Sequence, residues 1–228
     1  NIKVLERYIG KKNEIIFIAD EVVTGFGRLG HFFSSEEIFG VTPDIITCAK
    51  GITSGYLPLG AVLFSDKLIA DLKNDSSLFF HGYTYSGHPA CCAAALKNIE
   101  ILKRDKILEH VRNIEPYFSE KLNTLYELPI VGDIRGKGLM AGIECVINKD
   151  SKEALVLDQA IGSRIDEESI KLGLIIRPLY HICVLSPALI ITKEQINELT
   201  EKLYQAISNT IDQLKNEGLW SHHKCCLL

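Results

Sequence analysis

The sequence predicts an α/β fold for the first part of the chain, followed by a smaller α+β region. Short apolar runs of strand length alternate with glycine-rich stretches through the first 65 residues. Two long helical patterns follow Pro89, and a mixture of strand and helix patterns follows Leu128. We therefore predict two domains, residues 1–127 with connecting helices at their end, and residues 128–228.

The first domain should contain a mainly parallel sheet. Its three predicted strands are Glu14–Asp20, Asp44–Ala49 and Gly60–Ser65. Nearly continuous apolar runs of this kind are typical of strands that are buried on both faces. Helices are predicted over Ala90–Arg104 and Asp105–Tyr126, and Pro89 suits the first turn of the former.

The second domain should alternate short strands with longer helices. The predicted strands are Gly138–Val146, Leu174–Arg177 and Ile182–Leu185, and the predicted helices are Ser151–Lys171 and Lys193–Asn216. Thr192 is the expected cap of the last helix, with Glu194 in its first turn.

Composition excludes several classes of protein. The 228 residues carry a net charge of -4, and no basic stripe of the kind that binds nucleic acid is present. No apolar run approaches the roughly 20 residues of a membrane helix. Seven cysteines without metal-ligand spacing indicate reduced thiols and no metal site, which favours the cytosol. A mitochondrial leader further upstream is the open alternative.

The last four residues, Cys225–Leu228, fit a loose prenylation motif. Four-residue patterns arise often by chance, and a frayed tail is the simpler interpretation.

Asp20 ends the first predicted strand and precedes Glu21 and Val22. Ligands of open α/β sheets bind just outside the carboxyl ends of the strands. A buried carboxylate there needs a partner, which is either a ligand or a local cap or ion pair.

Lys50 follows the apolar run Ile45–Ala49 and precedes Gly51. If desolvated there, a lysine loses its proton more readily and its amine becomes nucleophilic, as a Schiff-base lysine requires. A surface lysine at the mouth of a loop is the alternative.

Residues 83–88, Tyr-Thr-Tyr-Ser-Gly-His, place hydroxyl groups directly before a helix N-terminus. Unpaired N–H groups and the helix dipole make such a position a candidate anion site. Ordinary capping of the helix by Ser86 explains the same pattern.

The segment Gly25–Gly30 matches the dinucleotide fingerprint G-x-G-x-x-G. That fingerprint requires a strand immediately before it and a helix immediately after it. Residues 21–24 intervene and no helical pattern follows, so we do not predict a dinucleotide site.

Longer motifs carry a family resemblance. They are IADEVVTGFGRLG (18–30), AKGITSGYLPLGA (49–61), HGYTYSGHP (81–89) and GDIRGKGLM (132–140). In this order and separation they resemble the class III aminotransferases, especially the omega-amino acid:pyruvate branch. The resemblance implies the fold-type I architecture, pyridoxal 5'-phosphate as cofactor and a homodimer with shared active sites. It also implies small-molecule amine and keto-acid substrates, with pyruvate as the expected acceptor.

The resemblance also implies roles for single residues. Lys50 would form the Schiff base with the cofactor and then move the proton. Asp20 would pair with the pyridine nitrogen, and Val22 would pack on the ring. Thr84, with the backbone near Tyr83, would bind the phosphate of the neighbouring subunit's cofactor.

Arg177 would face a substrate carboxylate. The sequence departs from the family pattern nearby, because Tyr180 stands where a turn usually has glycine and Ala188 where a second proline is usual. An ion pair within the second domain is therefore the alternative role for Arg177, and Arg135 is expected to be structural.

Members of the family have about twice this length, with a glycine/serine phosphate loop and a stacking aromatic residue upstream. Two other interpretations therefore stay open. One is a truncated, non-catalytic chain, and the other is an aminomutase or decarboxylase of the same fold. Neither the amine donor nor the stereochemistry follows from the sequence.

Overall fold

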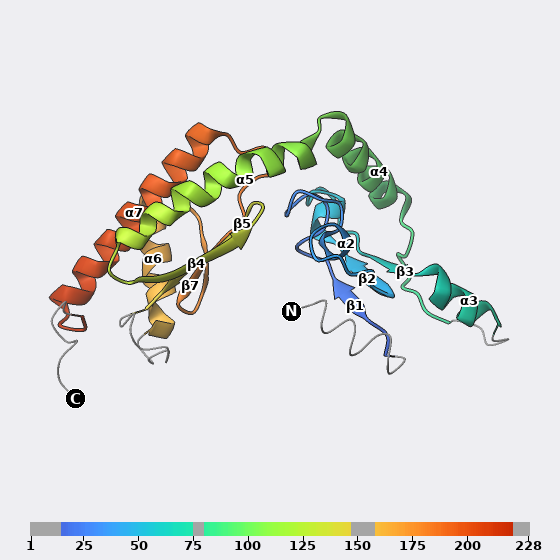
Figure 1. The fold of residues 1–228 in the computed structure, drawn as a ribbon, viewed down its shortest axis with the longest axis horizontal. Coiled ribbons are helices and arrows are strands. Elements are labelled where there is room, and N and C mark those ends of the chain that lie inside the picture. Colours follow the sequence, from blue (N-terminus) through green and yellow to red (C-terminus); the bar gives the residue numbers. More distant parts are fainter. Residues whose placement is uncertain (1–14, 75–79, 147–157, 221–228) are drawn as a thin grey trace. The chain divides into compact units, whose positions relative to one another are not determined.

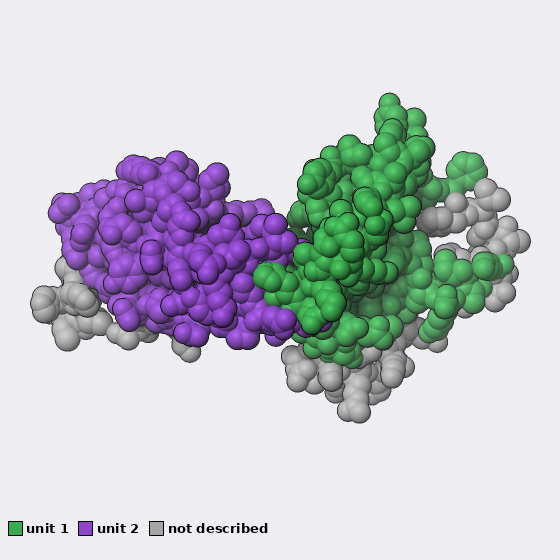
Figure 2. All heavy atoms as spheres, turned by 90° about the horizontal axis from the view of Figure 1, so that it is seen from above, with its two compact units in different colours: residues 1–111 green, residues 112–228 purple. Residues whose placement is uncertain are grey.

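The computed structural model describes residues 15–74, 80–146 and 158–220. The chain divides into two compact units, residues 1–111 and 112–228, which Figure 2 shows in different colours. The division falls within helix α5 (Ile107–Asn123), which belongs to the connecting helices expected from the sequence. The domain boundary after residue 127 stays a prediction.

Unit 1, residues 1–111, contains a three-stranded sheet. Its strands are β1 (Ile18–Asp20), β2 (Ile45–Cys48) and β3 (Ala61–Phe64), in the order β1-β2-β3. Each lies within one of the predicted apolar runs. β1 and β2 are parallel, with Ile18 opposite Ile45, whereas β2 and β3 are antiparallel. The described part of this sheet is therefore mixed, where the sequence led us to expect a mainly parallel one.

The expectation that Glu14–Asp20 is buried on both faces is wrong for this chain. Ile15, Ile16 and Ile18 are 48%, 51% and 55% exposed. β1 is an edge strand that pairs with β2 alone among the described strands. Apolar side chains on it consequently lack the second sheet neighbour that a central strand has.

Helical segments connect the strands of unit 1 and follow them. They are α2 (Ser34–Glu37), the 3₁₀ turn η1 (Lys50–Ile52), α3 (Asp66–Asn74) and α4 (Pro89–Arg104) (Figure 1). Pro89 occupies the first turn of α4, as predicted. Ser86 does not cap this helix, because its hydroxyl accepts the N–H of Tyr83 at 2.9 Å and closes a turn instead.

Unit 2, residues 112–228, is built on an antiparallel sheet with the order β4-β5-β7-β6. Its strands are β4 (Val131–Lys137), β5 (Met140–Cys145), β6 (Arg177–Leu179) and β7 (Ile182–Leu185). The sequence does not predict β4, because glycines and charged residues interrupt its apolar pattern. The strand predicted over Leu174–Arg177 is displaced and begins at Arg177.

One face of this sheet forms the core of unit 2. Ile143 and Cys183 lie opposite each other in register and are fully buried, and alternate residues along β5 are buried as well. Side chains on one face of a strand alternate with those on the other, so this pattern marks the face that the helices cover. The helices are the second half of α5, η2 (Thr124–Glu127), α6 (Asp158–Lys171) and α7 (Lys193–Asn216) (Figure 1).

α7 has the predicted bounds and the predicted cap. The Thr192 hydroxyl accepts the Gln195 N–H, and the Gln195 side chain accepts the Thr192 N–H, which is a complete capping box. α7 contacts α5 through a hydrogen bond of 2.7 Å between the Tyr117 hydroxyl and Asn197 Oδ1.

Five cysteines lie in the described part of the chain, and none of them forms a disulfide there. Among the helices in that part, we find none with the length and apolar character needed to cross a bilayer. The motif Cys225–Leu228 and the first half of the predicted helix Ser151–Lys171 lie outside the described residues.

Candidate active site

Asp20 ends β1 and Lys50 comes shortly after β2, at the carboxyl ends of two adjacent parallel strands. Asp20 lies opposite Thr47, and the Glu21 N–H donates to the Thr47 carbonyl at 2.9 Å, which extends the pairing one residue further. Lys50 comes shortly after Thr47 on the neighbouring strand. Because β1 and β2 are parallel, both residues lie at the same, carboxyl edge of the sheet. This edge is where open α/β sheets bind ligands.

Both side chains are exposed, which corrects the expectation of a buried acid and a sheltered amine. β1 has β2 as its single neighbour among the described strands of this sheet, which accounts for the exposure of Asp20. Asp20 Oδ1 accepts the Val22 N–H at 3.0 Å, and the described residues give its carboxylate no other hydrogen bond. The turn therefore orients the carboxylate and leaves it accessible to a ligand.

Lys50 has an uncommon backbone conformation. Its φ is +43°, and Ser54, at the other end of the same turn, has φ +50°. Conformations in the left-handed region cost a non-glycine residue about 1–3 kcal/mol and persist only where the surroundings enforce them. The 3₁₀ turn between them is closed by the Thr53 N–H, which donates to the Lys50 carbonyl at 3.3 Å.

The Gly25–Gly30 loop packs directly beneath the Lys50 turn. A Cβ on Gly51 would lie 2.9 Å from the Cβ of Phe26 and 3.1 Å from the Gly25 carbonyl oxygen. Phe26 is only 5% exposed, and its N–H donates to the Phe32 carbonyl at 2.8 Å. The G-x-G-x-x-G pattern thus forms a supporting loop of successive turns, without the helix that a dinucleotide site needs directly after it.

Glu21 fixes this loop to the end of β1. It is 3% exposed, and its Oε1 accepts the N–H groups of Ser34 and Ser35 at 2.8 and 2.6 Å, together with the Ser35 hydroxyl. Its Oε2 accepts the Thr24 hydroxyl. Burial acts to raise the pKa of Glu21, but the hydrogen bonds from Ser35, Thr24 and Ser34 outweigh burial and lower it.

An open groove of about 360 Å³ lies beside Lys50. It is lined by Lys50, Thr53 and the segment 55–59. Its volume falls within the range of about 300–1,000 Å³ that is usual for small-molecule sites. A primary amine at a groove of this size, with a carboxylate at the same sheet edge, fits a cofactor that carries an aldehyde and a basic ring nitrogen.

Three of the predicted site residues lie away from this pair along the chain. Tyr83 and Thr84 form an exposed turn before α4, and Thr84 makes no hydrogen bond with any part of the chain that the structure describes. Arg177 is exposed on β6 in unit 2. Their roles stay predictions. Tyr180, which follows β6, has φ +54°, so the turn does require the conformation that glycine adopts most easily.

Two residues that shape the site, Glu21 and Asn98 on α4, are not among the residues that the sequence predicts for it. A signal for Asn98 was present, because it follows Cys91 and Ala95 at the spacing of one helix face, and both of those are buried. A polar residue on an apolar face usually has a specific hydrogen-bond partner.

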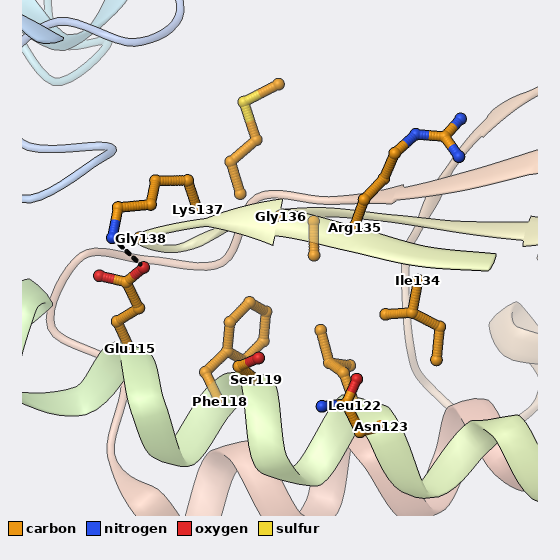
Figure 3. A pocket seen from close by; sticks show the side chains of 12 residues that line it. Glu115, Phe118, Ser119, Leu122, Asn123, Ile134, Arg135, Gly136, Lys137 and Gly138 are labelled. Atoms are coloured by element: carbon orange, nitrogen blue, oxygen red, sulfur yellow. Dashed lines mark ion pairs between the residues drawn. The ribbon is translucent and has the colours of Figure 1, made fainter. Parts of the chain in front are cut away.

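A second cleft lies in unit 2, between α5 and the β4–β5 hairpin (Figure 3). Its volume is about 50 Å³, too small for an organic ligand. The charged residues in its lining are ion-paired: Lys137 with Glu115 at 2.9 Å, and Arg135 with Asp133 and Glu144 at 2.6 Å each. The Lys137–Glu115 pair joins β4 to α5, and the Arg135–Glu144 pair joins β4 to β5, which is the structural role expected for Arg135.

Comparison with known proteins identifies relatives of both units. The sequence model of the family described as "Aminotransferase class-III" matches residues 4–207. A putrescine–pyruvate aminotransferase of Pseudomonas aeruginosa is 40% identical over 205 residues, which are 90% of this chain and 44% of that protein. The chain thus spans less than half the length of this relative.

Solved structures agree. A thermostable (S)-enantioselective omega-transaminase from Thermomicrobium roseum has a TM-score of 0.84 and 40% identity, covering 92% of this chain and 46% of that one. An amine transaminase from an uncultivated Pseudomonas species, solved in its PLP-bound (internal aldimine) form, has a TM-score of 0.83 and 37% identity, covering 91% of this chain and 46% of that one. Both are fold-type I enzymes, so the predicted fold class is confirmed.

Proposed function

Because the chain belongs to the class III aminotransferase family, we propose that it contributes Lys50 and Asp20 to a pyridoxal-phosphate site for amino-group transfer. The transfer runs between an amine or omega-amino acid and a keto acid, with pyruvate as the acceptor. The observation that carries this proposal is the placement of an amine and a carboxylate at the ends of adjacent parallel strands. The putrescine–pyruvate relative supports the choice of substrates.

The described residues fit the cofactor. When bound, pyridoxal phosphate supplies an aldehyde and a protonated ring that withdraws electrons from the reacting carbon. Lys50 Nζ would hold the aldehyde carbon of the bound cofactor. Once released from it, the same amine would accept the proton from the substrate carbon and return it. The Asp20 carboxylate would keep the ring nitrogen protonated, because a neighbouring negative charge raises the pKa of that nitrogen.

Other residues complete the proposed site. Val22, half-buried beside Asp20, packs against the ring. Thr84 and the backbone at Tyr83 bind a phosphate group in a homodimer with shared sites, which suits an exposed turn that precedes a helix. Arg177 binds the substrate carboxylate. The described cysteines form no disulfide, which supports a reducing compartment, and we propose the cytosol, with the mitochondrion as the alternative.

The exposure of Lys50 and Asp20 favours one competing function. A chain in which these two residues are exposed could fold without holding the cofactor, and would then act as a non-catalytic fragment. The two functions predict different reactivity. In the enzyme, the described residues make Lys50 react with the cofactor more than other lysines do, and in the non-catalytic fragment they do not.

Covalent trapping tests the proposal. The chain is incubated with pyridoxal phosphate, reduced with borohydride and digested, and each lysine is quantified by mass spectrometry. We expect Lys50 to be labelled at least tenfold more than the exposed helical residue Lys97. In the Lys50→Ala variant, the absorbance of the Schiff base between the cofactor and the protein should be lost. Equal labelling of Lys50 and Lys97 would contradict the proposal and support the non-catalytic fragment.

A further inference from the structure

Asn98 connects helix α4 to the Lys50 turn. Its Nδ2 donates to two consecutive carbonyl oxygens, those of Gly51 at 2.8 Å and Ile52 at 3.1 Å. Its Oδ1 accepts the Ser54 hydroxyl at 2.7 Å. One side chain from α4 therefore makes three hydrogen bonds to a turn that lies 44 to 47 residues earlier in the chain.

The direction of these bonds is settled by their partners. Carbonyl oxygens only accept, so the two groups at Gly51 and Ile52 require the N–H₂ end of the amide. The oxygen end then faces the Ser54 hydroxyl, which donates. The opposite orientation would place three oxygen atoms against one another, so the assignment does not depend on an arbitrary choice of amide flip.

The two carbonyls lie at the end of η1 (Lys50–Ile52), where a helix leaves its last acceptors incompletely paired. The Gly51 carbonyl also accepts the Ser54 N–H at 3.2 Å, whereas Asn98 is the one donor to the Ile52 carbonyl among the described residues. Asn98 consequently acts as a cap supplied from another element. It holds a turn that has a non-glycine residue with positive φ at each end, Lys50 at +43° and Ser54 at +50°.

We propose that Asn98 is a positioning residue for Lys50. By donating to the carbonyls of Gly51 and Ile52, Asn98 keeps the turn closed and Lys50 in its left-handed conformation, which sets the direction in which the amine enters the groove. The inference rests on the proposed function for the role of the amine. The hydrogen bonds by which Asn98 keeps the turn closed are formed in the chain without cofactor.

Isosteric replacement separates donation from packing. Asn98→Asp keeps the shape of the side chain and the acceptor for Ser54, but it places an oxygen against the two carbonyls. A donor role predicts that Asn98→Asp is at least as harmful as Asn98→Ala, whereas a side chain that only fills space predicts near-normal behaviour for Asn98→Asp. Asn113→Asp, at an exposed position of α5, is the matched control.

The first measurement uses no cofactor. Hydrogen–deuterium exchange is followed in a peptide that covers residues 49–57, where the N–H groups of Ile52, Thr53, Ser54 and Tyr56 are bonded within the turn. We expect exchange to become roughly tenfold faster in Asn98→Ala and Asn98→Asp, because loss of one to two net hydrogen bonds changes an opening equilibrium by about that factor. Exchange in a peptide that covers residues 91–104 should stay within about twofold if α4 remains folded.

The second measurement is borohydride trapping at Lys50, with Lys97 as internal reference. We expect the ratio of Lys50 to Lys97 labelling to fall about tenfold in both Asn98 variants and to be unchanged in Asn113→Asp. Ser54→Ala removes only one of the three bonds and should give a smaller change in both measurements. It keeps the inference testable if the Asn98 variants fail to fold.

The outcomes divide clearly. Unchanged exchange at residues 49–57 in the Asn98 variants, or a normal Asn98→Asp, overturns the inference. If exchange at residues 49–57 becomes faster but the ratio of Lys50 to Lys97 labelling does not change, the positioning role of Asn98 is also overturned. If wild-type Lys50 is not preferentially labelled, the proposed function fails, and exchange alone then decides whether Asn98 holds the turn.

Discussion

Replacement of Glu21 by glutamine should destabilise unit 1 and leave unit 2 unchanged. The side chain is 3% exposed, and three donors from Ser34 and Ser35 converge on Oε1, while Thr24 donates to Oε2. Glutamine keeps the shape and can keep all four contacts, because a hydroxyl at Thr24 can accept as well as donate. It loses only the charge.

The magnitude follows from these contacts. A hydrogen bond to a charged group stabilises by about 1.5–3 kcal/mol and a neutral one by about 0.5–1.5 kcal/mol, so each of the three bonds on Oε1 loses roughly 1 kcal/mol. The lower cost of burying a neutral amide offsets part of this. We expect a net loss of about 2 kcal/mol, which corresponds to a shift of about 1 M in the urea midpoint for a unit of this size.

Thiol labelling can assign the loss to one unit. Cys48 and Cys91 are buried in unit 1, and Cys145 and Cys183 are buried in unit 2. Pulse labelling across a urea series, read by mass spectrometry, therefore reports both units in one sample. We expect the Cys48 midpoint to fall by about 1 M in Glu21→Gln and the Cys145 midpoint to stay constant. Equal shifts in both, or none in either, would refute the reasoning.

The pH dependence gives a second check with a definite sign. Burial raises the pKa of Glu21, but the hydrogen bonds outweigh burial, so the pKa is lower in the folded chain than in the unfolded chain. Its stabilising contribution is complete above the unfolded value of about 4.3 and is lost as the pH falls through the folded value. The difference between wild type and Glu21→Gln should therefore be constant near neutrality and disappear in acid.

Two further predictions concern the turn between β6 and β7, with the fluorescence of buried Trp220 reporting the urea midpoint of unit 2. Tyr180→Gly should stabilise unit 2 by about 1 kcal/mol, because φ is +54° and the ring is mostly exposed, whereas Tyr180→Ala should bring no such gain. Gly162→Ala should destabilise it by about 2 kcal/mol, because a Cβ there would collide with the Tyr180 carbonyl oxygen. The exposed neighbour Ser163→Ala serves as its control, and a Gly162→Ala protein as stable as wild type would contradict the packing described.

The local sequence pattern predicted most of the helices and strands. It failed where a segment becomes a strand only by pairing with another strand. α4 and α7 have their own periodicity and terminal signals, so their bounds follow from the sequence. β4 contains two glycines and three charged residues, and it becomes a strand only through pairing with β5. The exposure of β1 could not be predicted either. An apolar run shows that a strand is able to be buried, but it does not show whether another segment packs against that strand.

The candidate site divides in the same way. Asp20 and Lys50 could be recognised because Asp20 ends, and Lys50 directly follows, an apolar run that contains a strand. Asn98 and Phe26 act through contacts between segments far apart in the sequence, and no local spacing places them beside Lys50. Glu21 was visible in the sequence, but its partners on α2 lie 13 and 14 residues further along, beyond the reach of a local motif.

The two central residues differ in how their positions are secured. Asp20 ends a regular strand, so its place at the sheet edge follows from pairing with β2 alone. Lys50 leaves the path of its strand through a turn with positive φ, which costs about 1–3 kcal/mol and would relax without support. Two contacts provide that support. Phe26 packs against Gly51, where a side chain would leave no room for it, and Asn98 on α4 caps the turn. A lysine at this point of a sequence is therefore insufficient to define the site, and substitutions that never touch the amine should alter its reactivity.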